Sequence, residues 1–162
     1  MFHNLLHPTI LFVTIEAARL RMRCLNDGTE LAIDPALAIN EKGKIIAIGD
    51  SHAVKAAGED PKNTVANGFK HPRTCMVDFE VAEAALSFLF KRLVSPFSLI
   101  KPVMIIQPLE KLEGNLTGVE ARWLRELGES VGARKVFVWV GKTLSDQEML
   151  SRQFPEEKGS LL

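Results

Sequence analysis

The order of apolar and polar residues in the first third of the chain follows the two-residue period of β-strands. Residues 9–15 (TILFVTI) are a short apolar and β-branched run, and residues 19–25 alternate polar with apolar side chains. A turn is expected at 26–29, where Gly28 can adopt a positive φ, and it leads back into a strand at 30–33. Further short strands are predicted at 36–39 and 44–48.

Farther along, the pattern changes to the longer period of α-helices. Ser51 is expected to cap a short helix that ends at Ala57, and residues 59–72, which hold prolines and charges, are expected to form a loop. The clearest helix is predicted at 79–93, where apolar residues dominate. Its polar residues fall on one narrow stripe formed by Glu80, Glu83, Ser87 and Lys91.

Strands and helices alternate in the last third of the chain. Apolar runs predict strands at 103–107 and 135–140, and a capping box of Thr117 and Glu120 predicts a helix that runs to about Val131. A final helix is expected at 146–153, capped by Thr143 or Ser145, followed by a frayed tail at about 155–162. This alternation requires parallel strands with right-handed crossovers, so we predict a single α/β domain with a mixed sheet flanked by helices.

Composition and charge exclude some function classes. The 162 residues carry 20 Lys+Arg and 20 Asp+Glu, and this balance argues against a basic nucleic-acid-binding domain. No apolar run reaches the roughly 18 residues of a membrane-spanning helix. Cys24 and Cys75 lie far apart and outside any CxxC motif, so we expect two buried thiols in a reducing cytosol.

Phosphate and metal motifs are missing from the sequence. No GxxxxGK[ST] or GxGxxG pattern occurs, and residues 14–20 (TIEAARL) contain no glycine that would let the backbone approach a phosphate. No Cys or matching carboxylate accompanies the histidines, so no metal site is expected at His3, His7, His52 or His71.

Several carboxylates could act as acids or bases, although structural roles account for them. Asp78 and Glu80 fall at the start of the predicted helix, where negative charge is stabilising, and Glu110 and Glu113 form a second acidic pair. Glu120 could polarise a water molecule, but its capping-box position already explains it.

The segment 94–102 joins a buried helix to a buried strand, yet it carries Phe97, Leu99 and Ile100. These side chains either fold back onto the core or form an exposed apolar tip. Such a tip could press into a lipid interface or a partner's groove. Its basic neighbours are Lys91, Arg92 and Lys101.

Five segments, in matching order and spacing, resemble the bacterial actin-like family of MreB. They are residues 30–39 (ELAIDPALAI), 44–50 (KIIAIGD), 71–79 (HPRTCMVDF), 101–106 (KPVMII) and 117–136, which begins TGVEAR and ends GARKV. The resemblance covers about residues 13–141. It implies the first lobe of an actin-like fold: a ribonuclease-H-like mixed sheet with helices and a small α+β subdomain inserted at about 33–69.

The resemblance also implies a degenerate phosphate loop. Where the family reads DLGT, this chain has Thr14, Ile15, Glu16 and Ala17, so a metal-side Asp is replaced and Glu16 would repel a phosphate. The family's second phosphate loop and adenosine pocket belong to a second lobe, which the 162 residues are not expected to include. Glu120 aligns with the family's water-positioning glutamate and is expected to be a vestigial capping residue. No cofactor, no metal and no ATPase activity are therefore expected.

The function implied is that of a non-catalytic, MreB-like accessory or regulatory protein of the bacterial cell-shape cytoskeleton. It would be cytoplasmic, with peripheral contacts to the inner face of the cell membrane. Expected partners are an MreB-type filament or another cell-shape protein, or a second copy of the chain, and not nucleic acid. In some family members two apolar residues before the KPVMII-like segment dip into the membrane. Leu99 and Ile100 hold that place here, beside Phe97 and Lys101.

Two other functions stay open at this point. One is a small carboxylate- or metal-dependent enzyme on a ribonuclease-H-like scaffold, using Asp78, Glu80 or Glu120, an idea that rests on fold analogy. The other is a soluble adaptor with no membrane role. The resemblance to MreB also implies an amphipathic N-terminus, which the family often uses at the membrane. Met1, Phe2, Leu5 and Leu6 could serve this purpose here.

Overall fold

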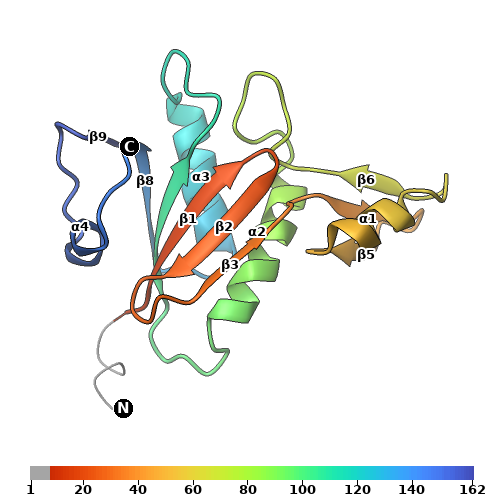
Figure 1. Ribbon diagram of the computed structural model, residues 1–162, viewed down its shortest axis with the longest axis horizontal. Helices are drawn as coiled ribbons and strands as arrows, with labels where there is room; N and C mark the ends of the chain where they lie inside the picture. The colour runs from red at the N-terminus through yellow and green to blue at the C-terminus, as the bar shows by residue number, and fades with distance from the viewer. Residues whose placement is uncertain (1–7) are drawn as a thin grey trace.

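The computed structural model describes residues 8–162 and contains a large and a small β-sheet (Figure 1). The large sheet has six strands in the order β3-β2-β1-β7-β8-β9, and the small sheet has three in the order β5-β4-β6. The strands of the large sheet are β1 (Ile10–Glu16), β2 (Arg19–Cys24), β3 (Glu30–Ile33), β7 (Val103–Pro108), β8 (Lys135–Gly141) and β9 (Gly159–Leu161). Those of the small sheet are β4 (Leu37–Ile39), β5 (Ile45–Ile48) and β6 (Thr64–Ala66).

β1 lies inside the large sheet, and its two neighbours run in opposite directions. It pairs antiparallel with β2 and parallel with β7, which in turn pairs parallel with β8. Every residue of β7 is buried, because a strand in the middle of the sheet is covered on both faces. The predicted mixed sheet is therefore confirmed.

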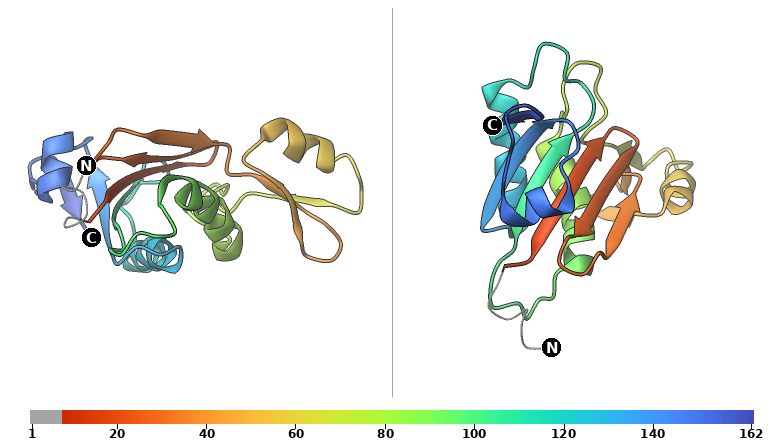
Figure 2. Two further views of the ribbon diagram at one scale, coloured as in Figure 1. Left: turned by 90° about the horizontal axis from the view of Figure 1, so that it is seen from below. Right: turned by 60° about the vertical axis from the view of Figure 1, so that its left-hand side comes forward.

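Helices α2 (Phe79–Leu93) and α3 (Gly118–Ser130) cover one face of the large sheet, as the left view of Figure 2 shows. Their buried side chains, such as Leu86 and Leu124, pack with strand residues such as Val13 and Met104 in the main hydrophobic core. Alternate strand residues point away from these helices, since successive side chains of a strand face opposite sides.

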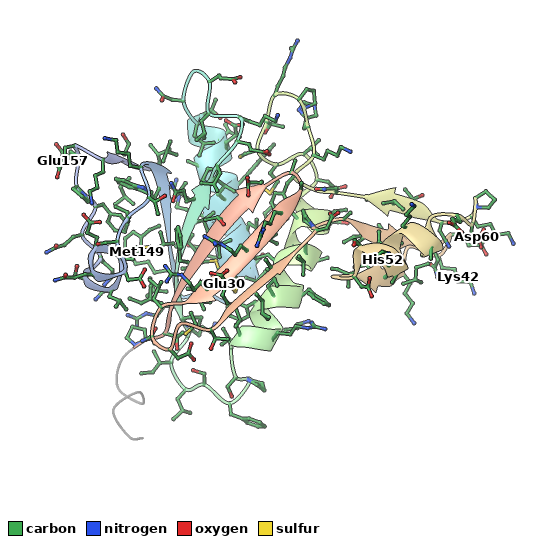
Figure 3. All side chains as sticks on the ribbon, in the orientation of Figure 1. Glu30, Lys42, His52, Asp60, Met149 and Glu157 are labelled. Atoms are coloured by element: carbon green, nitrogen blue, oxygen red, sulfur yellow. The ribbon has the colours of Figure 1, made fainter. Side chains whose placement is uncertain are left out.

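The other face of the sheet is covered by the end of the chain over part of its area. Helix α4 (Asp146–Ser151) supplies Met149, labelled in Figure 3, to a second apolar cluster. Met149 and Leu144 pack there with Phe12, Ile105 and Trp139. The indole nitrogen of Trp139 donates a 2.9 Å hydrogen bond to the carbonyl of Lys142, so its one polar group is satisfied despite burial.

The small sheet and helix α1 (Ser51–Ala57) project from the side of the large sheet, on the right of Figure 1. His52 on α1, and Lys42 and Asp60 at the far end, lie in this projecting part (Figure 3). Val54 is the buried residue of α1. The outer edge of the projection is mostly polar, while Ile46 and Val65 stay exposed.

Four details differ from the sequence predictions. Asp50, rather than Ser51, is the N-cap of α1, because its carboxylate accepts from the backbone N–H groups of His52 and Ala53. The expected loop at 59–72 contains β6, which pairs with β4. The expected frayed tail contains β9, which pairs with β8. Helix α4 ends at Ser151, two residues early, because Arg152 adopts the left-handed conformation.

Within residues 8–162, no helix has both the length and the apolar character needed to cross a bilayer.

Candidate functional site

The turn between β1 and β2 is where the sequence resemblance places a phosphate loop. Ala17 and Ala18 form this turn, because Glu16 pairs with Arg19 across the hairpin. Neither alanine has a positive φ. The turn therefore differs from the primed types whose twist fits a two-residue hairpin best.

Thr14 lies three residues before the turn and is buried within the sheet. It sits opposite Arg21 of β2 and Gln107 of β7. Gln107 is also buried, and its Nε2 donates a 2.8 Å hydrogen bond to the carbonyl of Gly141, while its Oε1 has no protein partner among the described residues. The neighbouring strands β1, β7 and β8 thus bring three neutral polar groups together near their carboxyl ends, namely the side chains of Thr14 and Gln107 and the carbonyl of Gly141. Open α/β sheets place ligands at this edge.

Both backbone groups of Ala17 are held by side chains from elsewhere in the chain. Its N–H donates a 2.7 Å hydrogen bond to Oε2 of Glu110, which follows β7. Its carbonyl accepts a 2.7 Å hydrogen bond from the side-chain amide of Asn67, which follows β6. The sequence pattern assigns no role to Asn67 and marks Glu110 only as half of an acidic pair. Glu110 lies two residues after a buried strand, and this position is the signal that could have pointed to this edge of the sheet.

A cleft of about 380 Å³ lies beside this turn, between the large sheet and β6 of the small one. Small side chains dominate the lining, so few groups are available to orient a ligand. Lys70, Asn67 and Asp34 supply the polar side chains, and the remaining lining residues are Ala17, Ala18, Ala36, Val65 and Ala66.

Glu120 is occupied by hydrogen bonds at the start of α3. Its Oε2 accepts from the backbone N–H and the hydroxyl of Thr117, at 3.0 and 2.8 Å, which completes the predicted capping box. Its Oε1 accepts a 2.9 Å hydrogen bond from the hydroxyl of Thr74. Burial alone would raise the pKa of Glu120, but these hydrogen bonds outweigh it and lower the pKa. Glu120 is therefore an ionised, hydrogen-bonded carboxylate.

Cys75 adjoins this carboxylate and is a buried free thiol, as is Cys24. Burial, and then the negative charge of Glu120, raise the pKa of Cys75 to about 11. The thiol is therefore protonated at neutral pH, and it lacks the electropositive surroundings of a nucleophilic cysteine.

The other carboxylates considered for catalysis have local roles. Asp78 is the N-cap of α2 and accepts a 3.1 Å hydrogen bond from the backbone N–H of Val81, while Glu80 is exposed in the first turn. In the part of the chain that the structure describes, no three His, Cys, Asp or Glu side chains gather closely enough to hold a metal ion. Asp78, Glu80 and Glu120 therefore do not form such a group.

The loop after α2 presents two apolar side chains to solvent. Phe97 is 89% exposed and Leu99 is 91% exposed, whereas Ile100 is half-buried. Lys91, Arg92 and Lys101 are exposed nearby in sequence. We call Phe97 and Leu99 the apolar tip. The expected contribution of Met1, Phe2, Leu5 and Leu6 lies outside the described residues.

Comparison with solved structures identifies the class of fold. The chain superposes on MreB5 of Spiroplasma citri bound to AMPPNP with a TM-score of 0.65, over 81% of this chain and 38% of that chain, at 17% identity. The ADP-bound form of the same protein gives a TM-score of 0.64. A non-polymerising mutant of MamK bound to AMPPNP gives 0.56, over 80% of this chain and 41% of that chain, at 12% identity. The domain has an actin-like α/β fold.

A sequence relative narrows this class. The chain is 32% identical over 116 residues to the cell shape-determining protein Mbl of Bacillus cereus, a match that covers 70% of this chain and 31% of Mbl. No protein-family profile matches the chain. The matched part of the chain is thus MreB-like in sequence and actin-like in fold, and the resemblance seen in the sequence is confirmed. The chain spans about a third of the length of these relatives.

Proposed function

We propose that this chain is a non-catalytic relative of MreB that acts in the cell-shape cytoskeleton through contacts with other proteins and with the membrane surface. The observation that carries the proposal is the β1–β2 turn, whose residues differ from the family's phosphate loop and whose backbone N–H is already hydrogen-bonded within the chain. Thr14 replaces the Asp of the family's DLGT loop, Glu16 replaces its Gly, and the N–H of Ala17 is bonded to Glu110.

Electrostatics supports the loss of nucleotide binding at this hairpin. A phosphate at the turn would lie close to the carboxylates of Glu16 and Glu110, and like charges in such proximity repel. The MreB5 and MamK structures, by contrast, are of nucleotide-bound proteins. The hydrogen bonds of Glu120 support the same reading, because they give that side chain a capping role that needs no substrate.

The expected partners are an MreB-type filament, another cell-shape protein or a second copy of the chain. Mbl, the sequence relative, is a cell shape-determining protein, which supports a partner of this kind. The protein would act in the cytoplasm and touch the inner face of the membrane. Nucleic acid is not an expected partner, because positive and negative charges balance.

The apolar tip supports the membrane contact. Phe97 and Leu99 are almost fully exposed, and exposed Lys91, Arg92 and Lys101 would favour an anionic lipid surface. Burying each apolar side chain would contribute roughly 1.5–3 kcal/mol before the cost of association. That resembles one marginal lipid anchor, so several linked copies would be needed for stable attachment.

Nucleotide assays test the non-catalytic part of the proposal. We expect no magnesium-dependent ATP hydrolysis and no ATP binding in the micromolar range by calorimetry. Hydrolysis that is lost in Glu120→Gln would overturn it and favour the carboxylate-dependent enzyme. Val119→Ser, which changes the exposed neighbour of Glu120, is the matched control.

Vesicle co-sedimentation tests the membrane part. We expect the full chain, clustered on a multivalent scaffold, to pellet with vesicles that contain anionic phosphatidylglycerol, and the Phe97→Ser/Leu99→Ser variant to stay in solution. Val119→Ser is again the control, since it removes a 59% exposed apolar side chain elsewhere on the surface. If the unmutated chain fails to pellet, the soluble adaptor is the better function. Co-sedimentation with purified MreB filaments and analytical ultracentrifugation test the protein partners.

A further inference from the structure

The hydrogen bond between Glu110 and Ala17 joins an acidic side chain to the tightest turn of the large sheet. A carboxylate oxygen lies 2.7 Å from the backbone nitrogen of Ala17, which is the length of a strong, charge-assisted hydrogen bond. Backbone N–H groups at turns are common binding places for anions. In this molecule the anion on that N–H comes from the chain itself.

The loop that carries Glu110 has an unusual backbone beside it. Lys111, the next residue, has a φ of 61°, and Asn115 has a φ of 69°, so two non-glycine residues lie in the left-handed region. Such conformations are strained and persist where surrounding contacts hold them. The contact of Glu110 with Ala17 is the neighbouring interaction that can hold Lys111 in this conformation.

The packing around the bond leaves no room for a competing ion. The gap between the turn and the Glu110 loop is lined by Glu16, Phe69 and Cys75 as well as the bonded pair, and it is too small for a water molecule. Phe69 is 2% exposed and Cys75 is 5% exposed, so this wall belongs to the main core. A phosphate could reach the N–H of Ala17 only after Glu110 has moved away.

A second hydrogen bond to the turn holds the carbonyl of Ala17. Asn67 donates to the carbonyl of Ala17 and also accepts a 2.9 Å hydrogen bond from the backbone N–H of Phe69. Asn67 follows the small sheet, so the turn is tied to both parts of the fold.

We propose that Glu110 is an internal anion that occupies the anion-binding N–H of the β1–β2 turn and holds it shut against phosphate. This inference rests on the proposed non-catalytic function and names the residue that enforces it. The carboxylate of Glu110 stands where a phosphate oxygen would accept the same hydrogen bond. Removing that carboxylate exposes the turn to an external anion.

Backbone amide NMR of the full chain, with inorganic phosphate as the probe, tests the inference. In the unmutated protein we expect a downfield, exchange-protected Ala17 amide that phosphate does not move. In Glu110→Ala the amide should shift upfield, and phosphate should then move it in a saturable way. Glu110→Gln is the conservative second variant, because it keeps the size of the side chain and removes its charge. Glu113→Gln removes the same charge from an exposed position of the same loop and should behave as the unmutated protein.

The outcomes separate this inference from the proposed function. If the Ala17 amide is unprotected in the unmutated protein, or stays unchanged in both Glu110 variants, the internal anion is wrong. If it shifts in the variants but phosphate moves no amide, the turn is not an anion site and the inference fails, while the non-catalytic function stands. If phosphate or MgATP already moves the Ala17 amide of the unmutated protein, both fail.

Discussion

The guanidinium of Arg23 donates two hydrogen bonds, of 2.8 and 2.6 Å, to the carboxylate of Asp146. Arg23 lies on β2 and Asp146 begins α4. The pair therefore connects the β1–β2 hairpin to the C-terminal segment, which covers the face of the sheet that α2 and α3 leave open. The hydrogen bond to Asp146 raises the pKa of Arg23 and the bond from Arg23 lowers the pKa of Asp146, as expected for an ion pair.

Asp146→Asn should weaken this connection modestly. Because the Asp146 side chain is 56% exposed, we expect a loss of about 0.2–1 kcal/mol in the free energy of unfolding, the range of exposed ion pairs. Urea denaturation of the variant measures it, with Glu157→Gln, at an exposed position far from Arg23 in sequence, as the control. A double-mutant cycle with Arg23→Gln should return a coupling of the same size. No coupling would mean that the pair does not persist in solution.

Gly68→Ala should be strongly destabilising. A Cβ at this position would lie 2.5 Å from the backbone nitrogen of Ala82 and 2.6 Å from the carbonyl oxygen of Asp78, so the first turn of α2 would have to move. We expect a loss of about 1–3 kcal/mol or more, as for other overpacked sites. Gly118→Ala is the matched control, because no atom lies within 4 Å of its added Cβ. Thermal unfolding that ranks the two variants in the opposite order would contradict this packing.

Thr117→Ala should shorten or fray α3 at its start. The substitution removes the hydroxyl that accepts from the backbone N–H of Glu120 and donates to its carboxylate. Loss of an N-cap typically costs about 0.5–2 kcal/mol, and we expect a value in that range from chemical denaturation. Thr117→Ser keeps the hydroxyl and should unfold like the unmutated protein. Equal loss in both variants would show that the hydroxyl bonds contribute nothing.

Acid should loosen the C-terminal segment before the core. The hydrogen bond from Lys158 lowers the pKa of Glu148 to about 2, from an ordinary value of 4.5. Because the folded pKa is the lower one, this stabilisation is fully present above about pH 4.5 and is lost as the pH falls towards 2. The protection factor of the β9 amides, which is the intrinsic exchange rate divided by the observed rate, should fall as the pH is lowered from 5 to 2. Glu148→Gln should show the lower protection factor already at pH 5 and little further change.

Cys75 should be nearly inert to alkylation in the folded protein. With a pKa of about 11 and a buried position, the fraction of thiolate at pH 8 is about one in a thousand. In a Cys24→Ser background, mass spectrometry should detect iodoacetamide labelling only as fast as the chain unfolds. Glu120→Gln removes a charge that raises this pKa, so it should not slow the labelling. Rapid labelling of folded Cys75 would show that the thiol is accessible.

Local pattern predicted most of the elements for identifiable reasons. The apolar run that became β7 and the capping box of Thr117 and Glu120 each carry their signal within a few residues. The expected loop and tail were wrong at β6 and β9 because those strands are only three residues long, and pairing with β4 and β8 creates them.

The candidate site was less accessible to sequence reasoning. The resemblance to MreB aligned Thr14 and Glu16 with the family's DLGT loop. The types of these two residues then sufficed to predict an altered phosphate loop. Glu110 lies 93 positions from Ala17 and Asn67 lies 50 positions away, so no periodicity in the sequence connects them. The exposure of Phe97 and Leu99 was also undecided, since an apolar loop can fold either inward or outward.

The sequence by itself determined the helices and the longer strands, because caps and hydrophobic period act between neighbours in the chain, whereas β6 and β9 depend on pairing with β4 and β8. It also determined the MreB-like character of the domain, through motifs that keep their order and spacing. Only the tertiary structure decided that Glu110 lies on the backbone of Ala17 and that Phe97 points into solvent. Contacts of this kind depend on how the whole sheet brings distant segments together, and local sequence contains no record of that arrangement.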